Sequence, residues 1–281
     1  MISAITVNYK TIDYTLKMLE SLFAHHDSTG LEVFVVENAS GDSTEELEHR
    51  FPQVRVIHNK TNLGFAGGCN VAIKEATGDF IVLVNPDILF DDNALEQLEG
   101  KMVTSPDVGI GGISLKNLNG SQQACVWAFP EPLDQYLLLL KLNHPFPRLT
   151  PFKRWLMRGF DYSQSADVDQ VMGALFCIRR ELIEEIGFLD ERFFMWYEEV
   201  DYCRRAKNAG WRVRYFSDIT ARHKKGASFD RVLTIHKQAL LRRSIRRYMF
   251  KHHGALAGTL FLFSEPLFWI TGLVAGLVKP R

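Results

Sequence analysis

The sequence contains few cysteines and no excess of charge of either sign, and each absence excludes a class of protein. Its 281 residues include four cysteines, which lie far apart and show no metal-ligand spacing. We therefore expect buried, reduced thiols in a reducing compartment. The 33 basic and 33 acidic residues cancel, and no basic stretch is interleaved with aromatic residues or forms a recognition-helix pattern. Binding to nucleic acid is therefore not expected.

A secretory signal is also missing from the N-terminal stretch. Residues 2–7 form a strand-like apolar run, with no basic segment before it and no cleavage site after it. Together with the reduced thiols, this predicts a cytoplasmic protein.

The basic residues that are present gather toward the C-terminus. Residues 222–253 hold ten Lys or Arg residues and a single acidic residue, Asp230, so this stretch carries +9 and the remainder −9. Residues 235–250 have apolar side chains at helical spacing with arginines beside them, which is the pattern of a basic amphipathic helix. Such a helix favours an anionic surface, either lipid or lipid-linked phosphate.

The apolar residues 255–278 are numerous enough to cross a bilayer, but Glu265 and Pro266 lie in their middle. A charge at mid-membrane is costly, and proline breaks a helix. We therefore expect two short helices in the membrane interface, which would place the protein at the inner face of the cell membrane as a peripheral or monotopic protein. The alternative is a helical pair packed on the catalytic domain or on another subunit, so a homo-oligomer stays open.

The first hundred residues alternate between apolar runs and stretches with helical spacing. The apolar runs predict strands at residues 2–7, 32–36, 54–58 and 80–84. Helices are predicted at residues 12–25, after a capping-box-like pair formed by Asp42 and Glu45, after the glycine-rich residues 62–68, and at residues 91–103. This alternation predicts parallel strands joined by right-handed crossovers, as in a nucleotide-binding α/β fold.

Polar side chains follow three of these strands. Asn8 and Tyr9 follow the first strand, and Glu37 and Asn38 follow the second. Asp87, in the segment Asn85-Pro86-Asp87, follows the fourth. Ligands bind at the carboxyl edge of open α/β sheets, and a carboxylate there suits a divalent cation that holds phosphates. The alternative is a plain strand-to-turn exit, since Pro and Asp favour turns.

The glycine-rich residues 62–68 allow two interpretations. Glycine lets a backbone approach a ligand closely, but this segment is neither G-x-G-x-x-G nor a P-loop. It is equally consistent with a tight turn that packs a helix onto the sheet. Residues 130–167 show little order and suggest either a flexible loop over the site or an acceptor-side flap. Order returns with an apolar run at residues 168–178, helices at 180–186 and up to residue 208, and a strand at 211–216.

Three carboxylates, Glu198, Glu199 and Asp201, directly follow the aromatic and apolar residues 193–197. Acidic residues are favoured at the start of a helix by its dipole, and Asp201 has the spacing of an ion pair with Arg205. Alternatively, the aromatic neighbours raise the pKa of a carboxylate that takes a proton from an attacking hydroxyl. His223 is either a metal ligand beside Asp87 or part of the basic run that continues to Lys225.

Taken in order, these motifs resemble glycosyltransferase family 2, and within it the bacterial rhamnosyltransferase-like branch. The resemblance spans residues 2–225 and rests on Val7-Asn8-Tyr9, Val36-Glu37-Asn38-Ala39-Ser40-Gly41-Asp42, Asn62-Leu63-Gly64-Phe65-Ala66-Gly67-Gly68-Cys69-Asn70, Asn85-Pro86-Asp87, Gly173-Ala174, Phe188-Leu189-Asp190-Glu191-Arg192-Phe193-Phe194, Glu198-Glu199-Val200-Asp201 and His223. It implies a GT-A fold, a Rossmann-like mixed sheet flanked by helices. The implied domains are a catalytic domain at residues 1–225 and a basic and apolar helical tail at residues 226–281.

The resemblance also implies roles for individual residues. Those expected at the nucleotide are Asn8, Tyr9, Glu37, Asn38, Asn62, Gly64, Phe65, Gly67 and Asn85. A divalent metal, Mg²⁺ or Mn²⁺, is expected at Asp87, with His223 as a further ligand. Glu199 takes the position of the catalytic base and Glu198 is its rival, because the family commonly has Glu-Asp where this chain has Glu-Glu. Asn85 likewise replaces an Asp that many relatives carry.

The implied reaction is an inverting sugar transfer from a nucleoside diphosphate, with a dTDP- or UDP-sugar as donor and L-rhamnose from dTDP-rhamnose as the first candidate. The expected acceptor is a glycan or a polyprenyl-diphosphate-linked glycan in cell-surface polysaccharide synthesis. One alternative is a sugar nucleotidyltransferase, although the segment after the first strand, Asn8-Tyr9-Lys10-Thr11, lacks glycine. The other is a catalytically degenerate nucleotide-sugar-binding module, which Asn85 and Glu199 would explain.

Overall fold

A mixed sheet forms the centre of the molecule in the computed structural model, which describes residues 1–27, 29–224 and 234–278. Within these residues the sheet has nine strands, with the order β3-β2-β1-β4-β10-β6-β11-β5 and β8 beside β11. The first four strands are parallel, as predicted. Their bounds are β1 Ile2–Asn8, β2 Leu31–Glu37, β3 Val54–His58 and β4 Phe80–Val84. All five residues of β4 are buried, so this strand lies inside the core.

The second half of the sheet is mixed. β10 is antiparallel to both β4 and β6, and β11 is parallel to β6. The bounds are β5 Ile88–Leu89, β6 Val108–Lys116, β8 Ala166–Asp167, β10 Leu175–Arg179 and β11 Arg212–His223. A separate small sheet pairs β7 (Val126–Trp127) with β9 (Gln170–Val171). The strand predicted at residues 211–216 is therefore longer, and its far end brings His223 beside Ile88.

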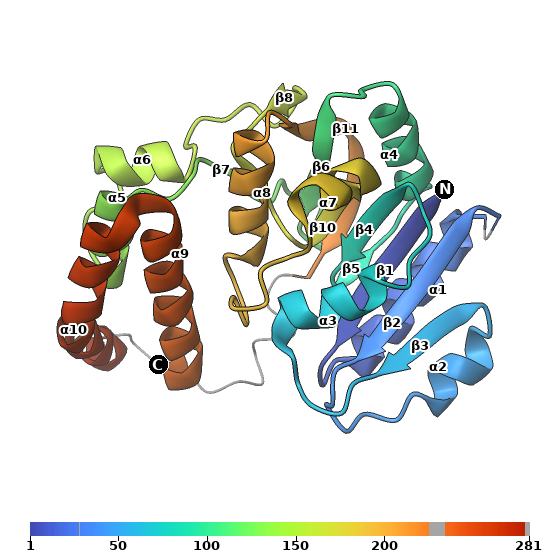
Figure 1. The fold of residues 1–281 in the computed structure, drawn as a ribbon, viewed down its shortest axis with the longest axis horizontal. Coiled ribbons are helices and arrows are strands. Elements are labelled where there is room, and N and C mark those ends of the chain that lie inside the picture. Colours follow the sequence, from blue (N-terminus) through green and yellow to red (C-terminus); the bar gives the residue numbers. More distant parts are fainter. Residues whose placement is uncertain (28, 225–233, 279–281) are drawn as a thin grey trace.

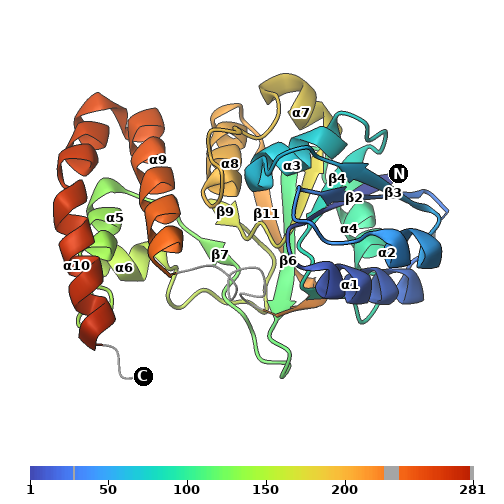
Figure 2. The same cartoon turned by 90° about the horizontal axis from the view of Figure 1, so that it is seen from below.

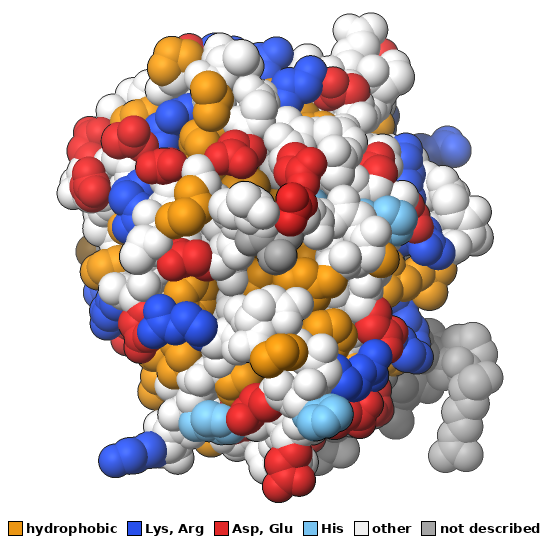
Figure 3. All heavy atoms as spheres, turned by 90° about the vertical axis from the view of Figure 1, so that its right-hand side faces the viewer, with side chains coloured by type: hydrophobic (Ala, Val, Ile, Leu, Met, Phe, Trp, Pro, Cys, Tyr) orange, Lys and Arg blue, Asp and Glu red, His pale blue; other side chains and the backbone are white. Residues whose placement is uncertain are grey.

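Helices cover both faces of the sheet (Figure 2). α3 (Gly64–Ile73), α7 (Arg180–Ile186) and α8 (Glu198–Asn208) lie on one face, and α1 (Ile12–His25) and α4 (Ala94–Val103) lie on the other. A short helix, α2 (Glu45–Arg50), accompanies the edge strand β3. The face on this side carries acidic, basic and apolar side chains next to one another (Figure 3). All four cysteines are buried and free, as predicted.

Two segments that were predicted to lack regular structure contain helices. Helix α3 begins at Gly64, so the glycines lie in its first turns rather than in a loop before it. They serve close packing, because a Cβ on Gly68 would lie 3.0 Å from Cγ1 of Val7. Residues 130–167, predicted to have little order, contain α5 (Pro132–Leu139) and α6 (Thr150–Trp155).

The C-terminal segment folds as two helices, α9 (Thr234–Phe263) and α10 (Glu265–Val278), in agreement with the predicted helical tail. Gly254, with φ of +83°, is non-helical and kinks α9. The two helices gather with α5 and α6 into a helical group on the outer side of α8 (Figure 1). The predicted domain boundary after residue 225, and Lys225 itself, lie outside the described residues.

The tail combines buried and exposed apolar side chains. Phe261 and Phe268 are buried against the ring of Tyr136 in α5, with centroid separations of 5.6 and 5.1 Å. In contrast, Leu256 is 88% exposed and Phe263 is 78% exposed. Among the described residues, no single helix is long and apolar enough to cross a bilayer. Helices α9 and α10 meet these two requirements only together, as a pair bent by 53°.

Candidate active site

The end of β1 is joined to the turn after β2 through the side chain of Asn8. Its amide nitrogen donates to Oδ2 of Asp42 at 2.9 Å, and its Oδ1 accepts from the hydroxyls of Thr11 and Thr15, both at 3.1 Å. Helix α2 begins after Thr44 without a side-chain cap hydrogen bond, so the capping box predicted from Asp42 and Glu45 does not form. Asn8 is fully buried, so its position predicts a role in shaping the site rather than an exposed contact. The neighbouring Tyr9 is half-buried.

The end of β2 forms a tight turn around the carboxylate of Glu37. Its oxygens accept from the backbone nitrogens of Ala39 at 3.0 Å and Ser40 at 2.7 Å, and from the Ser40 hydroxyl. Ala39 adopts a positive φ of +56°, a conformation that costs free energy for a residue with a Cβ. The carboxylate thereby stabilises the turn that lies next to Asn8.

Asn38 links this turn to the start of α3. Its Nδ2 donates to Oδ1 of Asn62 at 3.1 Å and to the carbonyl of Gly64 at 3.0 Å, and its Oδ1 accepts from the backbone nitrogen of Leu63 at 3.1 Å. Asn62 in turn accepts from the Gly64 nitrogen at 2.9 Å. The structure therefore brings the predicted residues Glu37, Asn38, Asn62 and Gly64 into one cluster at the carboxyl edge of the parallel strands.

The start of α3 contacts the segment that leads to the acidic pair. Phe65 donates its backbone N–H to the carbonyl of Phe194 at 2.9 Å. Gly64 has a φ of +74°, and a Cβ there would lie 2.2 Å from that carbonyl oxygen. Only glycine fits this approach. The predicted Gly67 has a local role, since a Cβ on it would lie 2.8 Å from Cβ of Leu63.

The end of β4 is linked to Glu199 by contacts through Gly173 and Ala174. The backbone nitrogen of Asn85 donates to the carbonyl of Ala174 at 2.8 Å. A Cβ on the preceding Gly173 would lie 3.4 Å from Cβ of Glu199, so the glycine backbone lies directly against this carboxylate's side chain. The segment that ends in Asp87 and the start of α8 therefore lie at the same edge of the sheet.

Asp87 and His223, predicted from positions 136 residues apart, are neighbours. Oδ1 of Asp87 lies 3.3 Å from Nε2 of His223, and both side chains are buried. The other ring nitrogen, Nδ1, lies 2.7 Å from Oε1 of Gln123. An amide oxygen only accepts hydrogen bonds, so Nδ1 carries a proton, and in this tautomer the Nε2 lone pair faces the carboxylate.

Two acceptors that face each other need a shared cation or a second proton on the ring. Carboxylate oxygen suits both Mg²⁺ and Mn²⁺, whereas imidazole nitrogen is a ligand typical of transition metals. Gln123 supplies the hydrogen bond that orients a metal-binding histidine. Asp87 and His223 thus fit as a two-residue platform for a divalent cation. No group of three or more His, Cys, Asp or Glu side chains with metal-binding geometry occurs in the described part of the chain.

Glu198 and Glu199 begin α8 in an environment that disfavours negative charge. Burial raises the pKa of Glu198 well above its usual range, and the adjacent Glu199 adds to that rise. Burial also raises the pKa of Glu199. Each carboxylate has one buried oxygen with no hydrogen-bond partner among the described residues. The preceding Trp196 and Tyr197 both have positive φ, +63° and +72°, so a strained turn aims this pair of carboxylates.

Asp201 has a different role from its two neighbours. It is fully buried, and its carboxylate pairs with Arg205 at 3.0 Å and with Lys251 and His252 at 2.7 Å each. Burial opposes its ionisation, but the hydrogen bonds from His252 and Lys251 lower the pKa of Asp201. The ion pair with Arg205 occurs as the spacing predicts, and the contacts with α9 attach the tail to α8.

The sequence profile described as Glycosyl transferase family 2 matches residues 3–162. The chain belongs to glycosyl transferase family 2. The matched segment contains the predicted donor-side residues from Asn8 to Asp87 and ends before the acidic pair. Membership makes the protein a glycosyltransferase, in agreement with the sequence prediction and in preference to a nucleotidyltransferase.

Several curated relatives have related names. The N-acetylglucosaminyl-diphospho-decaprenol L-rhamnosyltransferase of Mycobacterium tuberculosis (strain ATCC 25618 / H37Rv) is 24% identical over 72% of this chain and 69% of its own length. Rhamnosyltransferase WbbL of Escherichia coli (strain K12) is 24% identical over 79% of this chain and 83% of its own. The low-salt glycan biosynthesis hexosyltransferase Agl10 of Haloferax volcanii is 25% identical over 79% of this chain and 66% of its own.

Solved structures share the fold. The mannosyltransferase PcManGT from Pyrobaculum calidifontis, in complex with GDP-Man and Mn²⁺, covers 100% of this chain and 76% of its own with a TM-score of 0.60 and 18% identity. GalNAc-T7 with UDP, GalNAc and Mn²⁺ covers 86% of this chain and 48% of its own with a TM-score of 0.62 and 12% identity. These likenesses confirm the predicted GT-A fold. The roles of the individual site residues stay predictions.

Gln123 is a candidate site residue that the sequence alone does not reveal. Gln123 lies 100 residues from His223 in the chain, and no local pattern marks it. Asn70, which belongs to the family pattern, holds the segment before the acidic pair. Its Nδ2 donates to the Leu189 carbonyl and to Oε1 of Glu191, both at 2.9 Å.

Proposed function

We propose that this enzyme is an inverting glycosyltransferase that moves L-rhamnose from dTDP-rhamnose to a polyprenyl-diphosphate-linked glycan. We call Glu37, Asn38, Asn62 and Gly64 the β2–α3 cluster. The observation that carries the proposal is that one edge of the sheet holds this cluster, Asp87 with His223, and Glu199. The printed names of the relatives from M. tuberculosis and E. coli support rhamnose, and the former also supports the lipid diphosphate. The nucleotides in the structural neighbours support a nucleotide-sugar donor.

The proposed step is a single displacement. Glu199, as carboxylate, takes the proton of an acceptor hydroxyl, whose oxygen forms a bond to C1 of the donor sugar while the bond from C1 to the diphosphate breaks. Attack from the side opposite the leaving group inverts C1, so no enzyme nucleophile is needed. The raised pKa makes Glu199 a stronger base than an exposed glutamate.

On the donor side, the β2–α3 cluster would hold the nucleotide while Asp87 and His223 hold a divalent cation. Such a cation, when bound, stabilises the negative charge of the departing diphosphate. Gln123 keeps the His223 ring in the orientation that presents Nε2. The buried positions of both side chains exclude water from this contact.

Attachment to the inner face of the cell membrane, with the body of the protein in the cytoplasm, is part of the proposal. The exposed side chains of Leu256, Leu260, Phe263 and Ile270 in the tail support an interfacial contact, because apolar surface of this kind enters the boundary between headgroups and acyl chains. The tail also packs on α5, so membrane contact and protein contact use different faces.

The test is a panel of nucleotide sugars, each measured for thermal stabilisation with and without Mn²⁺ and then for transfer to a short-chain polyprenyl-diphosphate-linked N-acetylglucosamine. We expect dTDP-rhamnose with Mn²⁺ to give the largest rise in melting temperature, since a ligand at 100 times its Kd stabilises by about 2.7 kcal/mol. A folded protein that binds and consumes no sugar nucleotide of the panel would contradict the proposal.

A further inference from the structure

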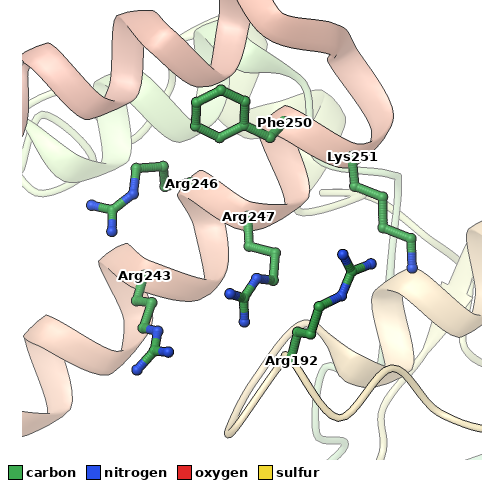
Figure 4. Close-up of a pocket in the computed structure, with 6 residues that line it drawn as sticks. All are labelled: Arg192, Arg243, Arg246, Arg247, Phe250 and Lys251. Carbon is green, nitrogen blue, oxygen red and sulfur yellow. The ribbon is translucent and has the colours of Figure 1, made fainter.

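A basic pocket opens between α9 and the segment that precedes α8. Its volume is about 370 Å³, and its lining consists of Arg192, Arg243, Arg246, Arg247, Phe250 and Lys251. Figure 4 shows Arg243 and Arg247 projecting from α9 toward the side on which Arg192 extends from the facing segment. Five cationic side chains and one aromatic ring therefore line one space. We refer to this space as the basic pocket.

The charges of the basic pocket are only partly compensated. Arg192 and Lys251 both pair with Asp190 at 2.7 Å, and Lys251 also reaches Asp201. Arg246 pairs with Glu265 at 3.2 Å.

Arg243 and Arg247 have no carboxylate at ion-pair distance within the described ranges. Burial, followed by the proximity of Arg243 and Arg192, lowers the pKa of Arg247. Two neighbouring guanidinium groups with no ion-pair partner among the described residues favour a bound anion, and guanidinium matches phosphate geometry in particular.

The pocket lies beside the segment that leads into the acidic pair. The segment that carries Arg192 contacts the start of α3 through Phe194 on one side. On its other side, the hydroxyl of Ser244 in α9 donates to the carbonyl of Met195 at 2.8 Å. The segment then continues into Glu198 and Glu199. This segment therefore separates an anion in the pocket from the β2–α3 cluster.

The pocket also adjoins the apolar surface of the tail. Phe250, 40% exposed, packs against Gly258 beyond the kink, where a Cβ would lie 2.2 Å from the ring. Leu256 and Leu260, on either side of Gly258, are exposed. A ligand with a phosphate group in the pocket and a hydrocarbon chain would have apolar side chains beside it.

We propose that the basic pocket binds the diphosphate of the lipid-linked acceptor, with Arg243 and Arg247 as its main contacts. This inference rests on the proposed function for the identity of the acceptor. The diphosphate would hold the acceptor so that its sugar lies toward Glu199, and the hydrocarbon chain would follow the exposed side of α9. Inorganic pyrophosphate offers the same anion without the chain, so it separates charge recognition from lipid recognition.

The experiment measures binding of farnesyl diphosphate, inorganic pyrophosphate, farnesol and dTDP to the full chain in detergent at low salt. The test variant is Arg243→Gln with Arg247→Gln, and the matched control is Arg55→Gln, an exposed arginine on β3. We expect the double variant to weaken farnesyl diphosphate binding roughly tenfold or more, and pyrophosphate binding similarly. Affinity for dTDP, farnesol binding and the melting temperature should stay near wild type.

The outcomes separate this inference from the proposed function. Equal farnesyl diphosphate affinity in wild type, double variant and control would overturn the pocket assignment, even if dTDP-rhamnose is bound and consumed. Loss of dTDP affinity in the double variant would also overturn it, because the pocket would then belong to the donor. Selective loss of farnesyl diphosphate affinity supports the assignment, including in a protein that proves inactive with every sugar nucleotide.

Discussion

Among single residues, Glu198 combines deep burial with a carboxylate oxygen that has no partner in the described structure. Its pKa is raised by burial and by Glu199. In the unfolded chain the group ionises near its ordinary value of 4.5, whereas the folded protein resists ionisation until higher pH. The native state is therefore penalised as pH rises above 4.5, and the penalty is complete above the folded-state pKa.

Glu198→Gln should stabilise the protein at neutral pH. The amide keeps the shape of the side chain and removes the buried charge, so the melting temperature should rise by about 2–4 °C for each kcal/mol gained. The gain should shrink as pH falls toward 4.5. Calorimetry between pH 4.5 and 8 measures it, with the exposed Glu46→Gln as control. A variant that is less stable than wild type at pH 8 would show that the charge of Glu198 does not destabilise the folded protein.

The sequence predicted that several candidate site residues share one edge of the sheet, but it did not predict their partners. Asn8, Glu37, Asn38 and Asp87 follow apolar runs whose period identifies strands, so their common edge follows from the parallel order. The pairing of Asp201 in α8 with Lys251 and His252 in α9 forms a latch between these helices. The contact of Gln123 and this latch join residues 100 and about 50 positions apart, which no local spacing reveals.

At the level of elements, the start of α3 depends on a glycine for two reasons. Gly64 has a positive φ, and its backbone touches the Phe194 carbonyl. Gly41 has a similar φ of +82°, but a Cβ on it would meet no atom within 4 Å. A comparison of alanine substitutions at Gly41 and Gly64 therefore distinguishes the cost of the positive φ from the cost of the collision with Phe194.

Gly64→Ala should be far more damaging than Gly41→Ala. The left-handed conformation costs each alanine about 1–2 kcal/mol, and only the first also collides with Phe194. We expect Gly64→Ala to lower the melting temperature further and to weaken nucleotide binding. Thermal unfolding and dTDP titration of both variants measure the difference. Equal losses would mean that the contact with Phe194 contributes nothing.

The latch between α8 and α9 gives a second prediction for elements. Asp201→Asn leaves Arg205, Lys251 and His252 without their buried counter-charge, and loss of one partner of a buried pair costs roughly 3–5 kcal/mol. Its stabilisation is fully present above the ordinary pKa of 3.8 and is lost as pH falls through the lowered folded-state pKa. We therefore expect a lower melting temperature at pH 7 and a smaller deficit in strong acid.

Proteolysis with trypsin should show the tail released first in the Asp201→Asn variant. Glu46→Gln, which removes an exposed pair with Arg50, is the control and should change stability little. An Asp201→Asn tail as resistant as that of wild type would contradict the latch.

Two element predictions failed for identifiable physical reasons. Pro132 and Pro151 mark residues 130–167 as irregular, yet proline is well tolerated in the first turn of a helix, where both occur. The glycine run at the start of α3 has low helix propensity, but close packing on β1 outweighs it. In both cases tertiary contacts decide the local structure.

For the whole molecule, the tail has one face on α5 and another exposed. Replacing Leu256 and Phe263 with glutamine should weaken flotation with vesicles that contain anionic lipid, because each buried CH₂ contributes about 0.8 kcal/mol to membrane binding. The control replaces Val103 and Leu118, which are exposed elsewhere in the chain. Equal flotation of the two double variants would assign membrane contact to another surface.

In the proposed reaction, Glu199 acts as the base opposite a donor held at the β2–α3 cluster and Asp87. The decisive measurement is single-turnover sugar transfer by Glu199→Gln at saturating donor and acceptor. We expect a rate roughly 10²–10⁴-fold below wild type, with donor affinity unchanged. Transfer at nearly the wild-type rate would show that Glu199 is not the base.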